Sequence, residues 1–67
     1  MKTTVYQQAR QQLKSIAQEV RRSHPKDKPA QRQDINDSAD MICRDLRLTE
    51  AQRDRLSNYA CKLHPKD

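Results

Sequence analysis

The sequence predicts an all-α fold, a small antiparallel three-helix bundle, and leaves self-association of that bundle open. Apolar residues recur at three- and four-residue steps in three segments, and a capping signal opens each segment. The same tetrad, His-Pro-Lys-Asp, follows two of them, at residues 24–27 and 64–67. No segment shows the alternation of apolar and polar residues that marks a strand. We expect one helical domain over residues 1–67.

The first predicted helix covers residues 5–22. Thr4 and Gln7 have the spacing of a capping box, in which each side chain bonds the backbone amide of the other residue. The helix cannot extend past Ser23, because Pro25 lacks an amide hydrogen and restricts the backbone of His24.

The second predicted helix covers residues 28–46, after a short basic connector. Asp27 stands where an N-cap residue is needed, and Pro29 falls in the first turn, where proline is well tolerated. The third predicted helix covers residues 50–63. Thr49 and Gln52 repeat the capping-box spacing, and His64 followed by proline ends the helix.

The core of this fold must be small, because the hydrophobic fraction is 33% and the chain has no Phe or Trp. We expect the larger apolar residues of the stripes to meet in it, supported by alanines: Tyr6, Leu13, Ile16, Val20, Ile35, Ile42, Leu46, Leu48, Leu56, Tyr59 and Leu63. Small domains with so little to bury gain stability from a disulfide, a metal or a second copy. Self-association is the option that needs no special residues here.

The cysteines and histidines are zinc-ligand types, but their spacing does not favour a metal site. Only Cys61 and His64 are close in the sequence, no paired-cysteine motif occurs, and His24 and His64 each precede a proline at a helix end. We expect no metal and no cofactor, a core thiol at Cys43 and a thiol at Cys61 that projects away from the core. The sequence leaves open whether the two cysteines are ever oxidised or bind metal.

The beginning of the chain predicts a cytoplasmic protein without a membrane partner. Residues 1–4 lead directly into a polar helix, without the apolar run of a secretory signal or a membrane span. Enzymatic activity is not expected either. No nucleophile, base and orienting acid occur at a suggestive spacing, and the chain has no Gly for a phosphate-binding loop. We therefore expect no catalytic residues and no small-molecule substrate.

The first candidate site is a protein-contact patch on the outer side of the second predicted helix. A helical projection places Met41 opposite the core stripe, among acidic side chains. Isolated exposed apolar residues are common on ordinary surfaces, but a flexible thioether among carboxylates also suits a basic protein partner or half of a dimer interface. The patch comprises Asp34, Asp37, Met41 and Asp45.

The leading hypothesis is therefore a small non-enzymatic interaction protein that binds a protein partner or itself through helix faces. A chain of this type suits an accessory protein, regulator or inhibitor encoded by a bacterium or a phage.

The second candidate site is a basic stripe on the first predicted helix and the connector that follows it. Residues 1–28 carry a net charge of +5, whereas residues 29–48 carry −1 and residues 49–67 carry +1. Such a stripe either keeps a small protein soluble or neutralises phosphates. It comprises Arg10, Lys14, Arg21, Arg22, Lys26 and Lys28. The alternative function is a nucleic-acid-binding module, without the aromatic platform that single strands require.

Overall fold

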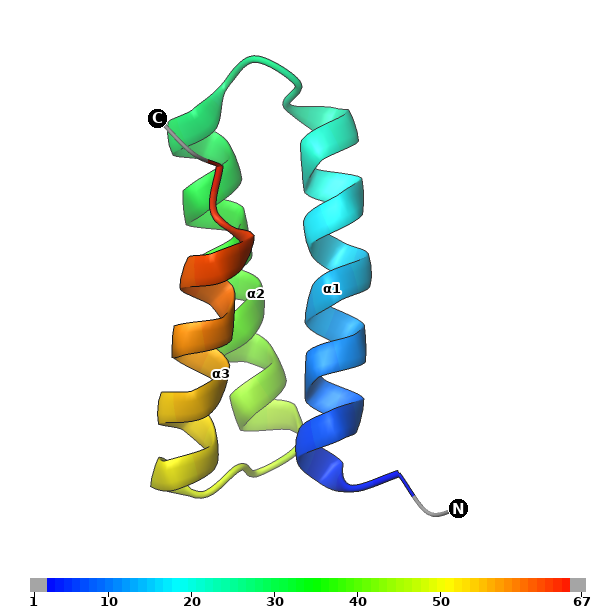
Figure 1. The fold of residues 1–67 in the computed structure, drawn as a ribbon, viewed down its shortest axis with the longest axis vertical. Coiled ribbons are helices and arrows are strands. Elements are labelled where there is room, and N and C mark those ends of the chain that lie inside the picture. The colour runs from blue at the N-terminus through cyan, green and yellow to red at the C-terminus, as the bar shows by residue number, and fades with distance from the viewer. Residues whose placement is uncertain (1–2, 66–67) are drawn as a thin grey trace.

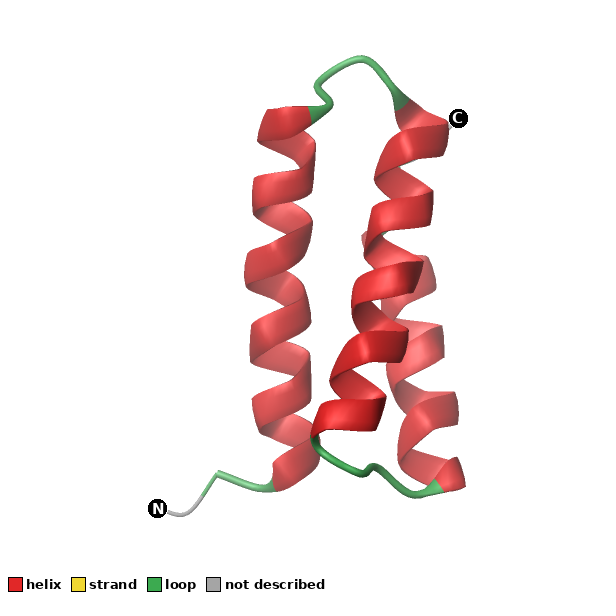
Figure 2. Ribbon diagram, turned by 180° about the vertical axis from the view of Figure 1, so that it is seen from behind, coloured by secondary structure: helices red, strands yellow, loops and turns green. Residues whose placement is uncertain are grey.

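The chain folds as three helices packed side by side. The computed structural model describes residues 3–65, with α1 at Val5–Ser23, α2 at Lys28–Asp45 and α3 at Glu50–Leu63. Each consecutive pair of helices is antiparallel, so α1 and α3 run in the same direction (Figure 1). Seen from behind, short loops join the helices (Figure 2). The predicted three-helix bundle is confirmed, with two helix ends displaced by one residue.

Side-chain caps begin α1 and α3 as the sequence predicts. The Thr4 hydroxyl accepts from the Gln7 amide and the Gln7 side chain accepts from the Thr4 amide, both at 3.1 Å. At α3 the Thr49 hydroxyl accepts from the Gln52 amide at 3.3 Å, and the Gln52 side chain accepts from the Thr49 amide at 3.0 Å. Both capping boxes satisfy amides that have no partner within the helix.

The connector between α1 and α2 is held by side chains from both of its ends. His24 caps the end of α1, and its carbonyl accepts a hydrogen bond from the buried side chain of Gln31. Asp27 caps α2 by accepting from the Ala30 amide at 3.1 Å. The first His-Pro-Lys-Asp tetrad therefore both ends one helix and begins the next. In the second tetrad His64 caps α3 with an extended backbone, and residues 66–67 lie outside the described residues.

The end of α2 is a tight turn built on a residue other than glycine. Arg47 has a φ of 51°, in the left-handed region. Its amide bonds the Arg44 carbonyl at 3.3 Å, and the Leu48 amide bonds the Cys43 carbonyl at 3.1 Å. These two bonds form a Schellman motif, which glycine usually completes. Leu46, predicted as the last helical residue, is instead the C-cap.

The core lies along the line where the three helices meet. Its largest fully buried side chains are Leu13, Ile35 and Leu56, one from each helix. The other buried apolar residues are Ala9, Ala17, Val20, Ala39, Ile42, Cys43, Leu48 and Ala60. Five predicted core residues are partly buried and pack against its edge: Tyr6, Ile16, Leu46, Tyr59 and Leu63. The four buried alanines allow neighbouring helices to approach closely, because their side chains are small.

Candidate interaction surfaces

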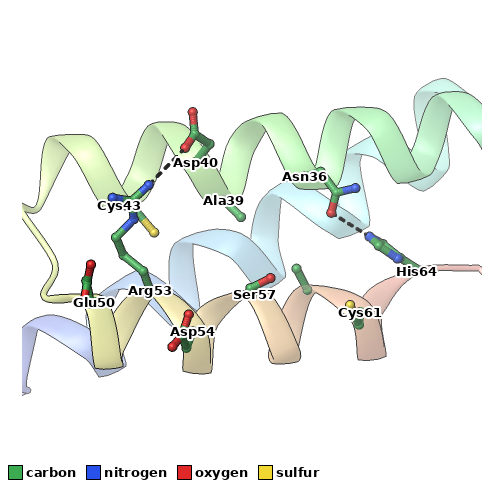
Figure 3. Close-up of a pocket in the computed structure, with 11 residues that line it drawn as sticks. Asn36, Ala39, Asp40, Cys43, Glu50, Arg53, Asp54, Ser57, Cys61 and His64 are labelled. Atoms are coloured by element: carbon green, nitrogen blue, oxygen red, sulfur yellow. Dashed lines mark hydrogen bonds and ion pairs between the residues drawn. The ribbon is translucent and has the colours of Figure 1, made fainter.

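A groove of about 730 Å³ runs between α2 and α3 (Figure 3). Three buried small side chains line it, those of Ala39 and Cys43 from α2 and of Ala60 from α3. The remaining lining residues are polar or charged, with Cys61 among them: Asn36, Asp40, Glu50, Arg53, Asp54, Ser57, Cys61 and His64. The groove therefore has apolar surface in its depth and charges at its rim.

Polar contacts join α2 to α3 toward the two ends of this groove. A guanidinium nitrogen of Arg53 lies 3.7 Å from the Asp40 carboxylate, which also accepts from Arg44 at 3.1 Å. Toward the other end, Nε2 of His64 donates to Oδ1 of Asn36 at 2.9 Å, and Figure 3 shows the two contacts well apart. Such exposed contacts link the two helices but add little stability, because water screens them.

The rim of the groove is anionic. Among the lining residues, the carboxylates of Asp40, Glu50 and Asp54 face a single guanidinium, that of Arg53. Within residues 3–65, Glu50 and Asp54 make no ion pair, so both are free to meet a partner's cations. The sequence prediction missed this site, because no spacing within α2 or α3 alone reveals which faces the two helices turn toward each other.

The two cysteines line the same groove in different surroundings. Cys43 is buried and Cys61 is exposed, as predicted, and both thiols are free. Burial raises the pKa of the Cys43 thiol above its ordinary value of 9.0, although the nearby Arg53 opposes the shift. Within residues 3–65, no cluster of three or more His, Cys, Asp or Glu side chains is arranged to hold a metal ion.

The predicted protein-contact patch lies on the outer face of α2, away from the groove. Met41 is 61% exposed, and Asp37 and Asp45 are exposed one turn before and after it. Asp34 differs from them, because its carboxylate lies 3.1 Å from Nε2 of His24 in the connector. All four residues thus lie on one face of α2, because Asp34 is seven residues before Met41, and Asp34 also contacts the connector through His24.

Three of the six residues in the predicted basic stripe lie on the side of α1 that faces α3. The Arg10 guanidinium covers the Tyr59 ring, 4.5 Å from its centroid. Arg21 donates to the Leu63 carbonyl at 3.0 Å, where the last carbonyls of α3 need donors. Lys14 lies between these two arginines and lines a shallow hollow with Tyr59.

The other three residues of the stripe lie elsewhere. Arg22 follows Arg21 directly, so the helix turns it by about 100° away from that side. Lys26 lies in the exposed connector, and Lys28 begins α2. The structure therefore does not bring these three cations to the α1/α3 side.

The sequence prediction missed two cations on the α3 side of the same surface. Arg55 and Lys62 are exposed, four residues before and three residues after Tyr59. This spacing places them on the same side of α3 as Tyr59, next to the row on α1. The sequence shows that Arg55, Tyr59 and Lys62 share one side of α3. Only the packing of α3 alongside α1 shows that these cations lie next to those of α1.

Comparison with known proteins adds no relative. No protein-family model, curated protein or solved structure matches this chain. None of the helices within residues 3–65 has the length and apolar character needed to cross a membrane. The candidate sites of the molecule are thus the α2/α3 groove, the outer face of α2 and the α1/α3 side.

Proposed function

We propose that this protein is a non-enzymatic interaction module that binds a basic amphipathic helix of a protein partner in the α2/α3 groove. The observation that carries the proposal is the groove itself, apolar in its depth and anionic at its rim. A basic amphipathic helix has the complementary pattern, with one apolar face and cationic flanks.

The shape of the bundle supports this choice of occupant. A helix laid between α2 and α3 would convert three helices into a four-helix arrangement, in which each helix buries a stripe against its neighbours. Ala39 and Ala60 present small side chains toward the incoming helix, which permits close approach. Larger side chains on the partner would then fill the volume that these alanines leave.

The charges at the rim support a cationic partner. Asp40 already contacts Arg44 and Arg53, whereas Glu50 and Asp54 are one turn apart on α3. Lysines or arginines flanking the apolar face of a helix would reach these two carboxylates. Such charge complementarity speeds encounter and fixes orientation more than it adds affinity.

The contacts of the groove also favour binding over catalysis. Cys61, His64 and Asn36 are residue types of a cysteine-hydrolase triad, and they lie toward the same end of the groove (Figure 3). His64 donates to Asn36 through its ring and to the Cys61 carbonyl through its backbone amide, but within residues 3–65 no hydrogen bond joins the Cys61 thiol to the His64 ring. A nucleophilic thiol is ordinarily activated by a base within hydrogen-bond reach, so this arrangement supports the binding proposal.

The state of the cysteines supports a cytoplasmic site of action. Both thiols are free, as is usual for proteins of a reducing compartment. An accessory protein, regulator or inhibitor of bacterial or phage origin is the class of protein in which we place this interaction module.

A synthetic lysine-rich amphipathic helical peptide tests the proposal. We expect it to shift the amide resonances of Ala39, Ser57 and Cys61 in an NMR titration of the whole protein. Ser57→Tyr places a bulky ring in the groove and should weaken peptide binding by tenfold or more, equivalent to about 1.4 kcal/mol. Ser15→Tyr makes the same change at an exposed position of α1 and should leave the affinity unchanged.

Three outcomes would contradict the groove as the binding site. The first is the absence of resonance shifts at the groove at millimolar peptide. The second is an equal affinity for the Ser57→Tyr and Ser15→Tyr proteins. The third is a set of shifts centred on Met41, together with weaker binding by Met41→Gln, which would transfer the site to the outer face of α2.

A further inference from the structure

We infer that the protein has a second binding surface, a cationic face between α1 and α3 that binds the phosphate backbone of double-stranded nucleic acid. The cationic face consists of Arg10, Lys14, Arg21, Arg55 and Lys62. It lies on the opposite side of α3 from the groove, so it is independent of the proposed protein-binding function.

Two rows of cations make up this face. α1 and α3 run in the same direction (Figure 1), and the contacts of Arg10 with Tyr59 and of Arg21 with Leu63 place the two rows alongside each other. Arg10 and Lys14 are one turn apart, about 6 Å along the helix axis, and Arg21 lies about 10 Å beyond Lys14. Phosphates follow one another at about 3.4 Å along the axis for each strand of duplex DNA, so the row is matched to every second or third phosphate.

Contacts between the helices hold part of the cationic face in place. The Arg10 guanidinium rests on the Tyr59 ring at 4.5 Å, and Arg21 donates to the Leu63 carbonyl at 3.0 Å. Both arginines keep further donors for a phosphate, because a guanidinium carries five N–H groups. Lys14 and Lys62 make no such contact within residues 3–65, so both ammonium groups are available to a ligand.

Among residues 3–65, no carboxylate belongs to the cationic face. The single acid of α1 is Glu19, which the helical rotation places on a different side from Lys14. The two acids of α3, Glu50 and Asp54, both line the α2/α3 groove. A surface that carries only positive charge attracts a polyanion from a distance. Binding then releases the counterions that had condensed on the polyanion.

The composition of the cationic face favours a duplex over other polyanions. Tyr59, the aromatic residue beneath the cationic face, is half-buried under Arg10 and offers no platform on which unpaired bases could stack. Membrane-surface helices need apolar anchors beside their cations, but the exposed large apolar residues among those described are Val5 and Met41, and Met41 lies on α2. An acidic protein partner would also need apolar contacts at the centre of the interface.

Two double variants that remove equal charge test this inference. Lys14→Ala with Lys62→Ala removes two cations from the face, whereas Arg22→Ala with Lys26→Ala removes two exposed cations from elsewhere. Binding to a short DNA duplex is measured by fluorescence anisotropy over a series of salt concentrations. With five phosphate contacts, log K for the wild type should fall against log salt with a slope of about −4.5.

The expected result is a change in slope for one pair alone. Lys14→Ala with Lys62→Ala should reduce the steepness by about 1.8, because each lost phosphate contact removes about 0.9. Arg22→Ala with Lys26→Ala should keep the wild-type slope. Circular dichroism checks that both proteins remain helical, and the basic-peptide titration at the groove should be unchanged in both when the protein is dilute enough to be monomeric.

Several results would overturn the inference. They are the absence of duplex binding at low salt, an equal change of slope in the two double variants, tighter binding of single strands than of the duplex, and binding of anionic lipid vesicles in preference to the duplex. The second result would mean that net charge alone attracts the DNA. The last would assign the cationic face to a lipid surface.

Discussion

At the scale of single residues, the surroundings of a side chain decide its role more than its type does. Cys43 and Cys61 line one groove, yet the first is buried and the second exposed. The same holds for two aspartates of the predicted patch, because Asp37 is exposed whereas Asp34 is engaged by His24. Sequence spacing alone predicted the difference between the cysteines, because their helical faces differ. It did not predict the His24 contact, which depends on the path of the connector.

The buried thiol makes stability depend on pH in the alkaline range. Because burial raises the pKa of Cys43, the folded protein holds a proton that the unfolded chain releases above its ordinary pKa of 9.0. The stabilising contribution is complete below that value and is lost as the pH rises through the folded-state pKa. We therefore expect urea unfolding to show a steeper alkaline loss of stability for wild type than for Cys43→Ala.

Comparison between variants isolates this thiol from the tyrosines and lysines that titrate in the same range. Cys61→Ala is the matched control, since it removes an exposed thiol and should follow the wild-type curve. Parallel curves for wild type and Cys43→Ala between pH 8 and about 11 would show that the buried thiol is not linked to folding.

At the scale of helices, local sequence signals predicted the first residue of each helix correctly and predicted the last residue less well. Three caps, at Thr4, Asp27 and Thr49, begin the helices where the sequence predicted. The end of α2 was harder to recognise, because its Schellman turn places Arg47 where glycine is expected. The sequence lacks glycine altogether, so the usual signal for that turn was absent.

Arg47→Gly should stabilise the protein. A left-handed residue with a Cβ atom costs about 1–2 kcal/mol, part of which is offset by the greater freedom of glycine in the unfolded chain. We expect a net gain of about 0.5–1 kcal/mol in the free energy of unfolding and a higher melting temperature. Arg55→Gly, at an exposed position inside α3, should instead lower the free energy of unfolding by about 1 kcal/mol. A loss in both variants would contradict a strained turn at Arg47.

At the scale of the whole molecule, the sites depend on how the helices are placed. The core positions of Leu13, Ile35 and Leu56 follow from helical spacing. The half-burial of Tyr59 does not, because it depends on the distance between α1 and α3. The cationic face likewise combines residues that are more than 30 positions apart, for which no local pattern exists. Helices were thus predictable from the sequence, whereas the surfaces that two helices share were not.

The two faces of α3 have opposite charge, and this predicts weak self-association. Glu50 and Asp54 line the groove on one side, while Arg55 and Lys62 belong to the cationic face on the other. The cationic face of one copy can therefore meet the anionic groove of another, in a head-to-tail contact between different surfaces. Salt screens such a contact, since the Debye length falls from about 30 Å at 0.01 M to about 3 Å at 1 M.

Light scattering after size-exclusion chromatography should accordingly give a mass above 7.9 kDa at low salt and the monomer mass at high salt. Glu50→Gln with Asp54→Asn should give the monomer mass at both, because the groove loses its free carboxylates. Asp37→Asn with Asp45→Asn removes the same charge from the outer face of α2 and should behave as wild type. The same mass at low and high salt would exclude the head-to-tail contact. Loss of association in the outer-face variant would assign self-association to the predicted patch around Met41.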